Sequence, residues 1–175
     1  MKTEQHSVEI KEAPSNRSWF VFQLAFWLVV CFLVAGLGSW ATADGVKTWY
    51  QDLNRPSWNP PDWVFPWVWT TLFAMMAISA ARITARRGWD RSVYVFLIQL
   101  GLNLLWSFLF FYFRQMFLAG VEIVLLVLAI GVTTYLFYLR DRLAGLLMLP
   151  YLVWVSFASF LNWTIVLLNG TETTL

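Results

Sequence analysis

Charge is what this sequence has least of, because Asp, Glu, Lys and Arg make up only 13% of it, against about 25% in a typical soluble domain. The few charges are also segregated. No charged side chain occurs in residues 18–43, 63–81, 92–113 or 143–171, and residues 115–139 contain only Glu122. Stretches of this kind exclude an ordinary soluble domain and indicate transmembrane helices, since a bilayer core of ~30 Å takes about 20 helical residues to cross.

Histidine and cysteine are nearly absent as well. His6 and Cys31 are the single examples of each, so the chain can form no internal disulfide and has no ligand cluster for zinc or axial histidine site for haem. There is also no Gly-rich phosphate loop, Ser/His/Asp set or pair of intramembrane carboxylates. We therefore expect no metal, no intrinsic cofactor and no ordinary hydrolytic or redox catalysis. The net charge of +2 says little about partners, and the basic residues are expected to orient the chain and to form no nucleic-acid-binding face.

The uncharged stretches predict an all-α membrane protein, a five-transmembrane-helix bundle with a short helical loop capping one end. Helices are expected because each satisfies its own backbone hydrogen bonds, and the stretches lack the alternation of barrel strands. A polar N-terminal tail (1–18) and a C-terminal tail (169–175) flank one transmembrane domain (19–168). The predicted spans are 19–40, 63–85, 92–112, 117–139 and 143–168.

The distribution of Lys and Arg predicts the orientation. Cytoplasmic loops of membrane proteins carry an excess of these residues. The N-terminal tail with the second and fourth loops holds nine of the twelve, and the opposite side holds three. We therefore predict a cytoplasmic N-terminus in a membrane of the bacterial inner type. The nine are Lys2, Lys11, Arg17, Arg82, Arg86, Arg87, Arg91, Arg140 and Arg142, and the three are Lys47, Arg55 and Arg114.

The segment from residue 49 to residue 69 concentrates the unusual residue types. It holds five of the twelve tryptophans and four of the six prolines, and its first apolar residues recur at helical spacing. We expect a short helix there that caps the bundle, with an interfacial helix among lipid headgroups as the alternative. Asn59 is expected to cap the second span, and Pro66 to kink it. The tryptophans are Trp49, Trp58, Trp63, Trp67 and Trp69.

Polar residues inside the spans mark further candidates. Gln99, Asn103 and Trp106 share one helix face by their spacing. A buried carboxamide needs a partner or a cavity, so interhelical hydrogen bonds and ligand contacts both remain open. Glu122 lies about one turn inside its span, where reaching out to water or pairing with Arg114 is favoured over a ligand role.

Two more features concern the first, second and fifth spans. Trp69 and Trp154 lie too deep to belong to an interfacial aromatic belt. Small residues at the end of the first span are expected to permit close helix approach, and an alanine stripe in the second is expected to form a packing seam, within the bundle or between protomers. These small residues are Ala35, Gly36 and Ser39, and Ala77, Ala81 and Ala85.

Several motifs, in order along residues 19–168, resemble the translocator protein family, also called tryptophan-rich sensory proteins (TspO/MBR). The resemblance implies a five-helix bundle, usually dimeric, that binds porphyrins, sterols and benzodiazepine-type ligands beneath the first loop. It also implies a deep tryptophan pair, here Trp69 and Trp154, in light-dependent porphyrin breakdown. The motifs are Trp49-Tyr50, Leu53-Asn54-Arg55-Pro56, Trp58-Asn59-Pro60-Pro61, Trp63-Val64-Phe65-Pro66, Trp69-Thr70, Gln99 with Asn103 and Trp106, Pro150-Tyr151 with Trp154, and Leu161-Asn162.

Residues and resemblance together predict a sensor for porphyrins and related flat apolar ligands. Tryptophan rings would stack on the tetrapyrrole, and Asn103, with Gln99 as a second donor, would orient its polar edge. A transporter of porphyrin or sterol-like molecules and a structural partner in a membrane complex are the alternatives. The predicted ligand-binding residues are Trp49, Trp58, Trp69, Gln99, Asn103, Trp106, Tyr151 and Trp154.

Overall fold

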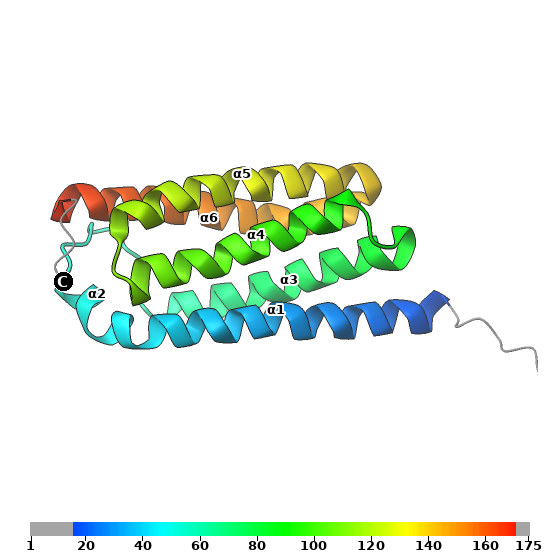
Figure 1. Cartoon of the computed structure of the whole chain (residues 1–175), viewed down its shortest axis with the longest axis horizontal. Coiled ribbons are helices and arrows are strands. Elements are labelled where there is room, and N and C mark those ends of the chain that lie inside the picture. The colour runs from blue at the N-terminus through cyan, green and yellow to red at the C-terminus, as the bar shows by residue number, and fades with distance from the viewer. Residues whose placement is uncertain (1–15, 171–175) are drawn as a thin grey trace, which may run out of the picture.

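Helices make up nearly all of the chain that the computed structural model describes, residues 16–170 (Figure 1). Five of them are long and apolar enough to cross a membrane, and no strand occurs in residues 16–170. The predicted all-α membrane bundle is therefore confirmed. The elements are α1 (Asn16–Lys47), α2 (Trp49–Asp52), α3 (Val64–Arg87), α4 (Arg91–Ser107), the π-helical turn η1 (Phe108–Tyr112), α5 (Met116–Arg140) and α6 (Arg142–Asn169). The predicted tails lie mostly outside the described residues.

The long helices pack side by side in a ring (Figure 1). α1 contacts α3 and α4, α3 contacts α6, α6 contacts α5, and α5 returns to α4. The short helix α2 lies at one end of this ring, near the end of α6, as expected for a cap. Hydrogen bonds in both directions join the loop to α6: the Asn54 backbone N–H donates to Asn169 Oδ1 (2.8 Å), and Asn169 Nδ2 donates to the Asn54 carbonyl (2.9 Å).

The helix α1 is longer than the predicted first span, and α3, which corresponds to the predicted second span, begins later than a cap at Asn59 would place it. α1 continues through residues 41–47, where Gly45 packs so closely on η1 that an added Cβ would lie 2.7 Å from the Phe111 carbonyl oxygen. α3 begins at Val64, so the predicted cap at Asn59 is wrong. A residue that precedes a proline disfavours helical geometry, which holds Asn59 and Pro60 outside the helix. Pro66 consequently lies in the first helical turn, where its missing N–H costs little, and the reason for a kink disappears.

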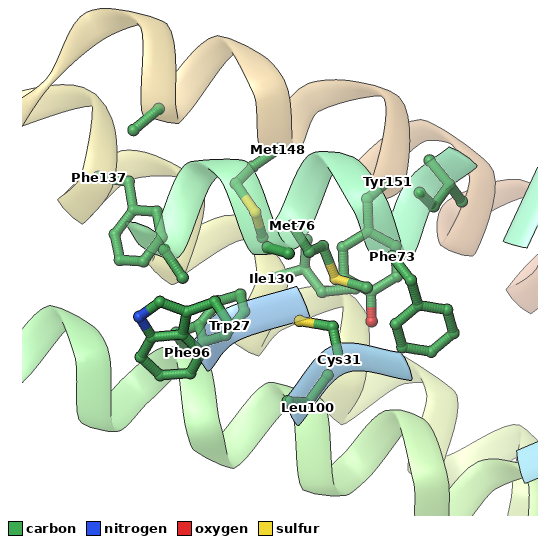
Figure 2. Close-up of a cluster of buried hydrophobic side chains, with 14 of the residues drawn as sticks. Trp27, Cys31, Phe73, Met76, Phe96, Leu100, Ile130, Phe137, Met148 and Tyr151 are labelled. Atoms are coloured by element: carbon green, nitrogen blue, oxygen red, sulfur yellow. The ribbon is translucent and has the colours of Figure 1, made fainter. Parts of the chain in front are cut away.

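The half of the bundle farther from α2 is solidly packed, and Figure 2 shows buried side chains that fill it. There the fully buried ring of Phe96 meets Trp27 edge-on, with centroids 5.3 Å apart, and stacks on Phe137 at 5.7 Å. Met76 and Met148 fill the adjoining space with no exposed surface. Ala77 and Ala81 are also fully buried, so these two members of the alanine stripe pack within the bundle, whereas Ala85 is partly exposed.

Ion pairs close this packed end. The buried carboxylate of Asp141 lies 2.9 Å from both Arg82 Nη2 and Arg86 Nη1, and it accepts from the N–H groups of Leu143 and Ala144 at the start of α6. Burial opposes its ionisation, but these hydrogen bonds and guanidinium groups prevail and hold the pKa of Asp141 below its ordinary value. Arg140 pairs with Asp90 in the same way. Arg82, Arg86 and Arg140 therefore tie helices together.

Candidate functional site

A cavity of about 580 Å³ occupies the other half of the bundle, beneath α2. Its volume falls within the range of small-molecule sites, about 300–1,000 Å³. Residues of α1, α2, α3, α4, η1 and α6 line it, and α5 contributes none. The aromatic part of the wall consists of Phe32, Tyr50, Phe65, Trp69, Phe73, Trp106, Phe110, Phe111 and Trp154.

Three of the predicted tryptophans meet at this cavity, each from a different helix. Trp69 of α3, Trp106 of α4 and Trp154 of α6 all line it and are all partly buried. Neighbouring rings support them: Trp106 stacks on Phe110 with centroids 5.2 Å apart, and Trp154 meets Phe65 at 5.9 Å. Rings held by such contacts present fixed faces, which suits stacking against a flat ligand.

Polar groups at the back of the cavity are mostly engaged with one another. Asn103 lines the cavity, and its Nδ2 donates to the hydroxyl of Tyr151 (3.1 Å). The indole N–H of Trp106 donates to Asn162 Oδ1 (3.1 Å), and Asn162 Nδ2 donates to the Met116 carbonyl (3.0 Å). The indole N–H of Trp154, in contrast, has no hydrogen-bond partner among residues 16–170. That nitrogen is itself buried, so this donor is unsatisfied in the structure.

Four predicted binding residues lie elsewhere. Tyr151 is fully buried behind the wall, against Trp69 with ring centroids 6.3 Å apart. Trp49 meets Phe110 edge-on at 5.6 Å without lining the cavity. Trp58 stacks on Phe160 at 5.3 Å, on the outside of α6, and is 41% exposed. Gln99, the fourth, is buried away from the cavity.

Gln99 and Glu122, two of the polar side chains within the spans, have no hydrogen-bond partner in the described chain. Gln99 is fully buried, and within residues 16–170 neither its amide nitrogen nor its oxygen has a hydrogen-bond partner. The prediction that Glu122 reaches water or Arg114 is wrong. Its side chain is 5% exposed, neither carboxylate oxygen has a partner in the described chain, and Arg114 lies 3.9 Å from Asp44 instead. The reason is packing, since α5 lies between α4 and α6 and turns this face inward with Ile123 and Leu126.

The wall formed by α1 could not be recognised in advance. Ala35, Gly36 and Ser39 were expected to bring helices close together, but all three line the cavity. An added Cβ at Gly36 would meet nothing within 4 Å. Small residues here leave space for the cavity. Their spacing would be the same in a close helix contact, so the sequence signal is ambiguous.

A network of side chains fixes the cap above the cavity. The hydroxyl of Tyr50 donates to Asn59 Oδ1 (2.9 Å), and the Arg55 guanidinium lies over the Tyr50 ring, 5.0 Å from its centroid. Burial raises the pKa of Tyr50 despite the nearby Arg55 charge, so the phenol stays protonated and keeps donating. Arg55 also pairs with Asp62 at 3.6 Å. These contacts favour the capping interpretation of this segment over a helix lying among headgroups.

Fold and site together define a multi-pass membrane protein with a tryptophan-walled cavity. The sequence model of the TspO/MBR family matches residues 27–168, and the chain belongs to this family. It is 44% identical to the tryptophan-rich protein TspO of Chlorobaculum tepidum, over 85% of this chain and 97% of that protein. It is 36% identical to the tryptophan-rich sensory protein of Cereibacter sphaeroides (88% and 94%) and 36% identical to the human translocator protein (70% and 75%).

Proposed function

We propose that this protein is a membrane receptor for porphyrins and related flat, apolar ligands, which bind in the cavity beneath α2. The observation that carries the proposal is the convergence of Trp69, Trp106 and Trp154 on one cavity of about 580 Å³. Three aromatic faces from three helices can enclose a planar ring system, and each aromatic pair contributes about 0.5–1.5 kcal/mol beyond the buried area. The names of the relatives, a sensory protein and translocator proteins, are compatible with this role.

A titration tests the proposal. Protoporphyrin is added to the detergent-solubilised protein, and binding is followed by the change in porphyrin absorption and the quenching of tryptophan fluorescence. Trp69→Ala should weaken binding about tenfold or more, since 1.4 kcal/mol corresponds to a factor of ten. Asn103→Ala should weaken it less, because the amide already donates to Tyr151.

The matched control is Trp67→Ala, which removes a tryptophan of the same helix that is 72% exposed and does not line the cavity. Its affinity should equal that of the wild type. If the wild type, Trp69→Ala and Asn103→Ala all bind protoporphyrin with equal affinity, the porphyrin does not bind in this cavity.

A second candidate activity is photochemical breakdown of the bound porphyrin, with Trp69 and Trp154 as electron donors. Both rings line the cavity, so both would adjoin a bound ring system. Under illumination, porphyrin fluorescence should decay more slowly in the Trp69→Phe, Trp154→Phe double variant than in the wild type. Equal decay rates at equal occupancy would rule this activity out.

Transport remains the alternative, and orientation and assembly remain predictions. Flux of porphyrin into ligand-free vesicles that contain the protein separates a carrier from a receptor. Six arginines at the end away from α2 support a cytoplasmic N-terminus, for which we propose a bacterial-type inner membrane. They are Arg82, Arg86, Arg87, Arg91, Arg140 and Arg142. Labelling of single cysteines placed at Arg87 and Asp52 tests that orientation, and chemical cross-linking in membranes tests the homodimer.

A further inference from the structure

The cavity has a gradient of polarity from its deep end to its mouth. Phe32, Trp69 and Phe73 form part of the deep wall. Two lining residues carry charge, and both lie at the end next to the cap: Lys47 is the last residue of α1, and Asp62 precedes α3. Every other lining residue is uncharged. A ligand with one ionised end would therefore have to place that end at the mouth, because a charge without a partner is costly in an apolar interior.

The two charges at the mouth are not equivalent. The Asp62 carboxylate is engaged: Arg55 Nη1 lies 3.6 Å from its Oδ1, and Gln51 Nε2 donates to its Oδ2 (3.1 Å). Gln51 Oε1 in turn accepts from Arg55 Nη2 (3.2 Å), so these three side chains hold one another. A cationic ligand would have to displace Arg55 to reach Asp62.

Lys47 has no such partner. Among the described residues, no carboxylate lies within 4.0 Å of its ammonium group. The acid one turn earlier on α1, Asp44, lies 3.9 Å from Arg114 and is 87% exposed. Lys47 is thus the one unpaired cation of the cavity wall, at the edge of a space from which a bound apolar ligand would expel water. Lys47 is exposed, so its attraction for an anion is expected to be the modest, salt-sensitive attraction of a surface ion pair.

We propose that the cavity selects anionic amphiphiles, meaning flat apolar molecules that carry a carboxylate at one edge, and that Lys47 contacts this carboxylate. The inference rests on the proposed function, in which a flat ligand fills the cavity. It assigns the charged end to the mouth, whereas the residue pattern suggested that Asn103 and Gln99 orient the polar edge. In the structure Asn103 Nδ2 donates to Tyr151 and Gln99 lies outside the cavity, so Lys47 is the better candidate.

The test compares two probes on matched variants. Protoporphyrin IX, which carries two carboxylates, and its dimethyl ester, which carries none, are titrated against wild type, Lys47→Gln and Lys47→Arg in a non-ionic detergent. The wild type should bind the acid more tightly than the ester, by roughly threefold or more at low salt, and added salt should reduce this preference. Lys47→Gln should lose the preference while keeping the ester affinity, and Lys47→Arg should keep it.

Arg114→Gln is the control, because it removes another cation from the same end that does not line the cavity. It should preserve the preference. A wild type that binds acid and ester equally, or a Lys47→Gln variant that still prefers the acid, overturns the proposal and leaves the proposed function standing. If neither probe binds the wild type, the proposed function fails and this inference fails with it.

Discussion

The two halves of this bundle use the same helices in opposite ways. In the half away from α2, Trp27, Phe96 and Phe137 fill the space between helices and are completely buried. In the half beneath α2, Trp69 and Trp154 turn their rings toward a cavity of about 580 Å³. Both halves are rich in aromatic residues, so composition does not separate them. The difference is whether opposing side chains are large enough to meet across the centre, and on the cavity side α1 supplies Ala35, Gly36 and Ser39 instead.

The largest expected effect comes from emptying the packed half. Phe137→Ala should lower the free energy of unfolding by about 3–5 kcal/mol, because the removed ring leaves a void that its neighbours cannot fill. Phe65→Ala, on the cavity side, should cost only about 1–2 kcal/mol, since that ring already borders open space. Thermal unfolding of both variants in the same detergent measures the difference. Equal losses would contradict the division into a packed half and a hollow half.

Adding one methyl group also distinguishes the packed half from the hollow half. An added Cβ at Gly145 would lie 2.5 Å from the Tyr138 Cα atom, a contact that requires the backbone of α5 or α6 to shift. Gly145→Ala should therefore destabilise the protein by about 1–3 kcal/mol. Gly36→Ala, whose added atom meets nothing within 4 Å, should unfold at the temperature of the wild type or slightly above it. A Gly145→Ala variant as stable as Gly36→Ala would show that the helices are less tightly packed than described.

A smaller effect concerns the ion pairs at the two ends. The folded pKa of Asp141 lies below its ordinary value of 3.8, so its ionised form stabilises the fold at neutral pH. This contribution should persist above about pH 4 and be lost as the pH falls through the lowered pKa. Asp141→Ala should cost about 1–2 kcal/mol at pH 7, because it removes both the helix cap and the ion pairs, and Asp141→Asn should cost less because an amide oxygen still caps.

The control for that prediction is Asp62→Asn at the mouth of the cavity, where the carboxylate is 50% exposed. Solvent screens this pair, so the variant should unfold like the wild type. Unfolding temperatures measured from pH 7 to pH 3 compare the three variants. If the stability of the wild type does not change below pH 4, ionisation of Asp141 does not stabilise the folded protein.

Much of this organisation could be predicted because it depends on regular spacing. Long uncharged stretches fix the helices, and positions three apart place Asn103 and Trp106 on one face. The depth of Trp69 and Trp154 separates them from interfacial residues. These four side chains line the same cavity.

What could not be predicted depends on contacts between segments distant in sequence. The helix α2 is a single turn, too short for its spacing to show which side chain points inward, and Tyr50 lines the cavity while its neighbour Trp49 does not. The direction of Glu122 follows from how α5 is inserted between α4 and α6. A small residue such as Gly36 is equally compatible with a close contact between two helices and with a cavity, until the side chains opposite it are known.

Filling the cavity tests the central claim most directly. Ala158 lines the cavity, so Ala158→Phe should place a ring in open space, weaken protoporphyrin binding by about tenfold or more and leave the unfolding temperature nearly unchanged. Ala80→Phe, at a fully buried position of the packed half, should prevent or severely impair folding. The decisive measurement is the protoporphyrin affinity of a correctly folded Ala158→Phe protein. Affinity reduced tenfold or more agrees with a ligand cavity at this place, and wild-type affinity would contradict it.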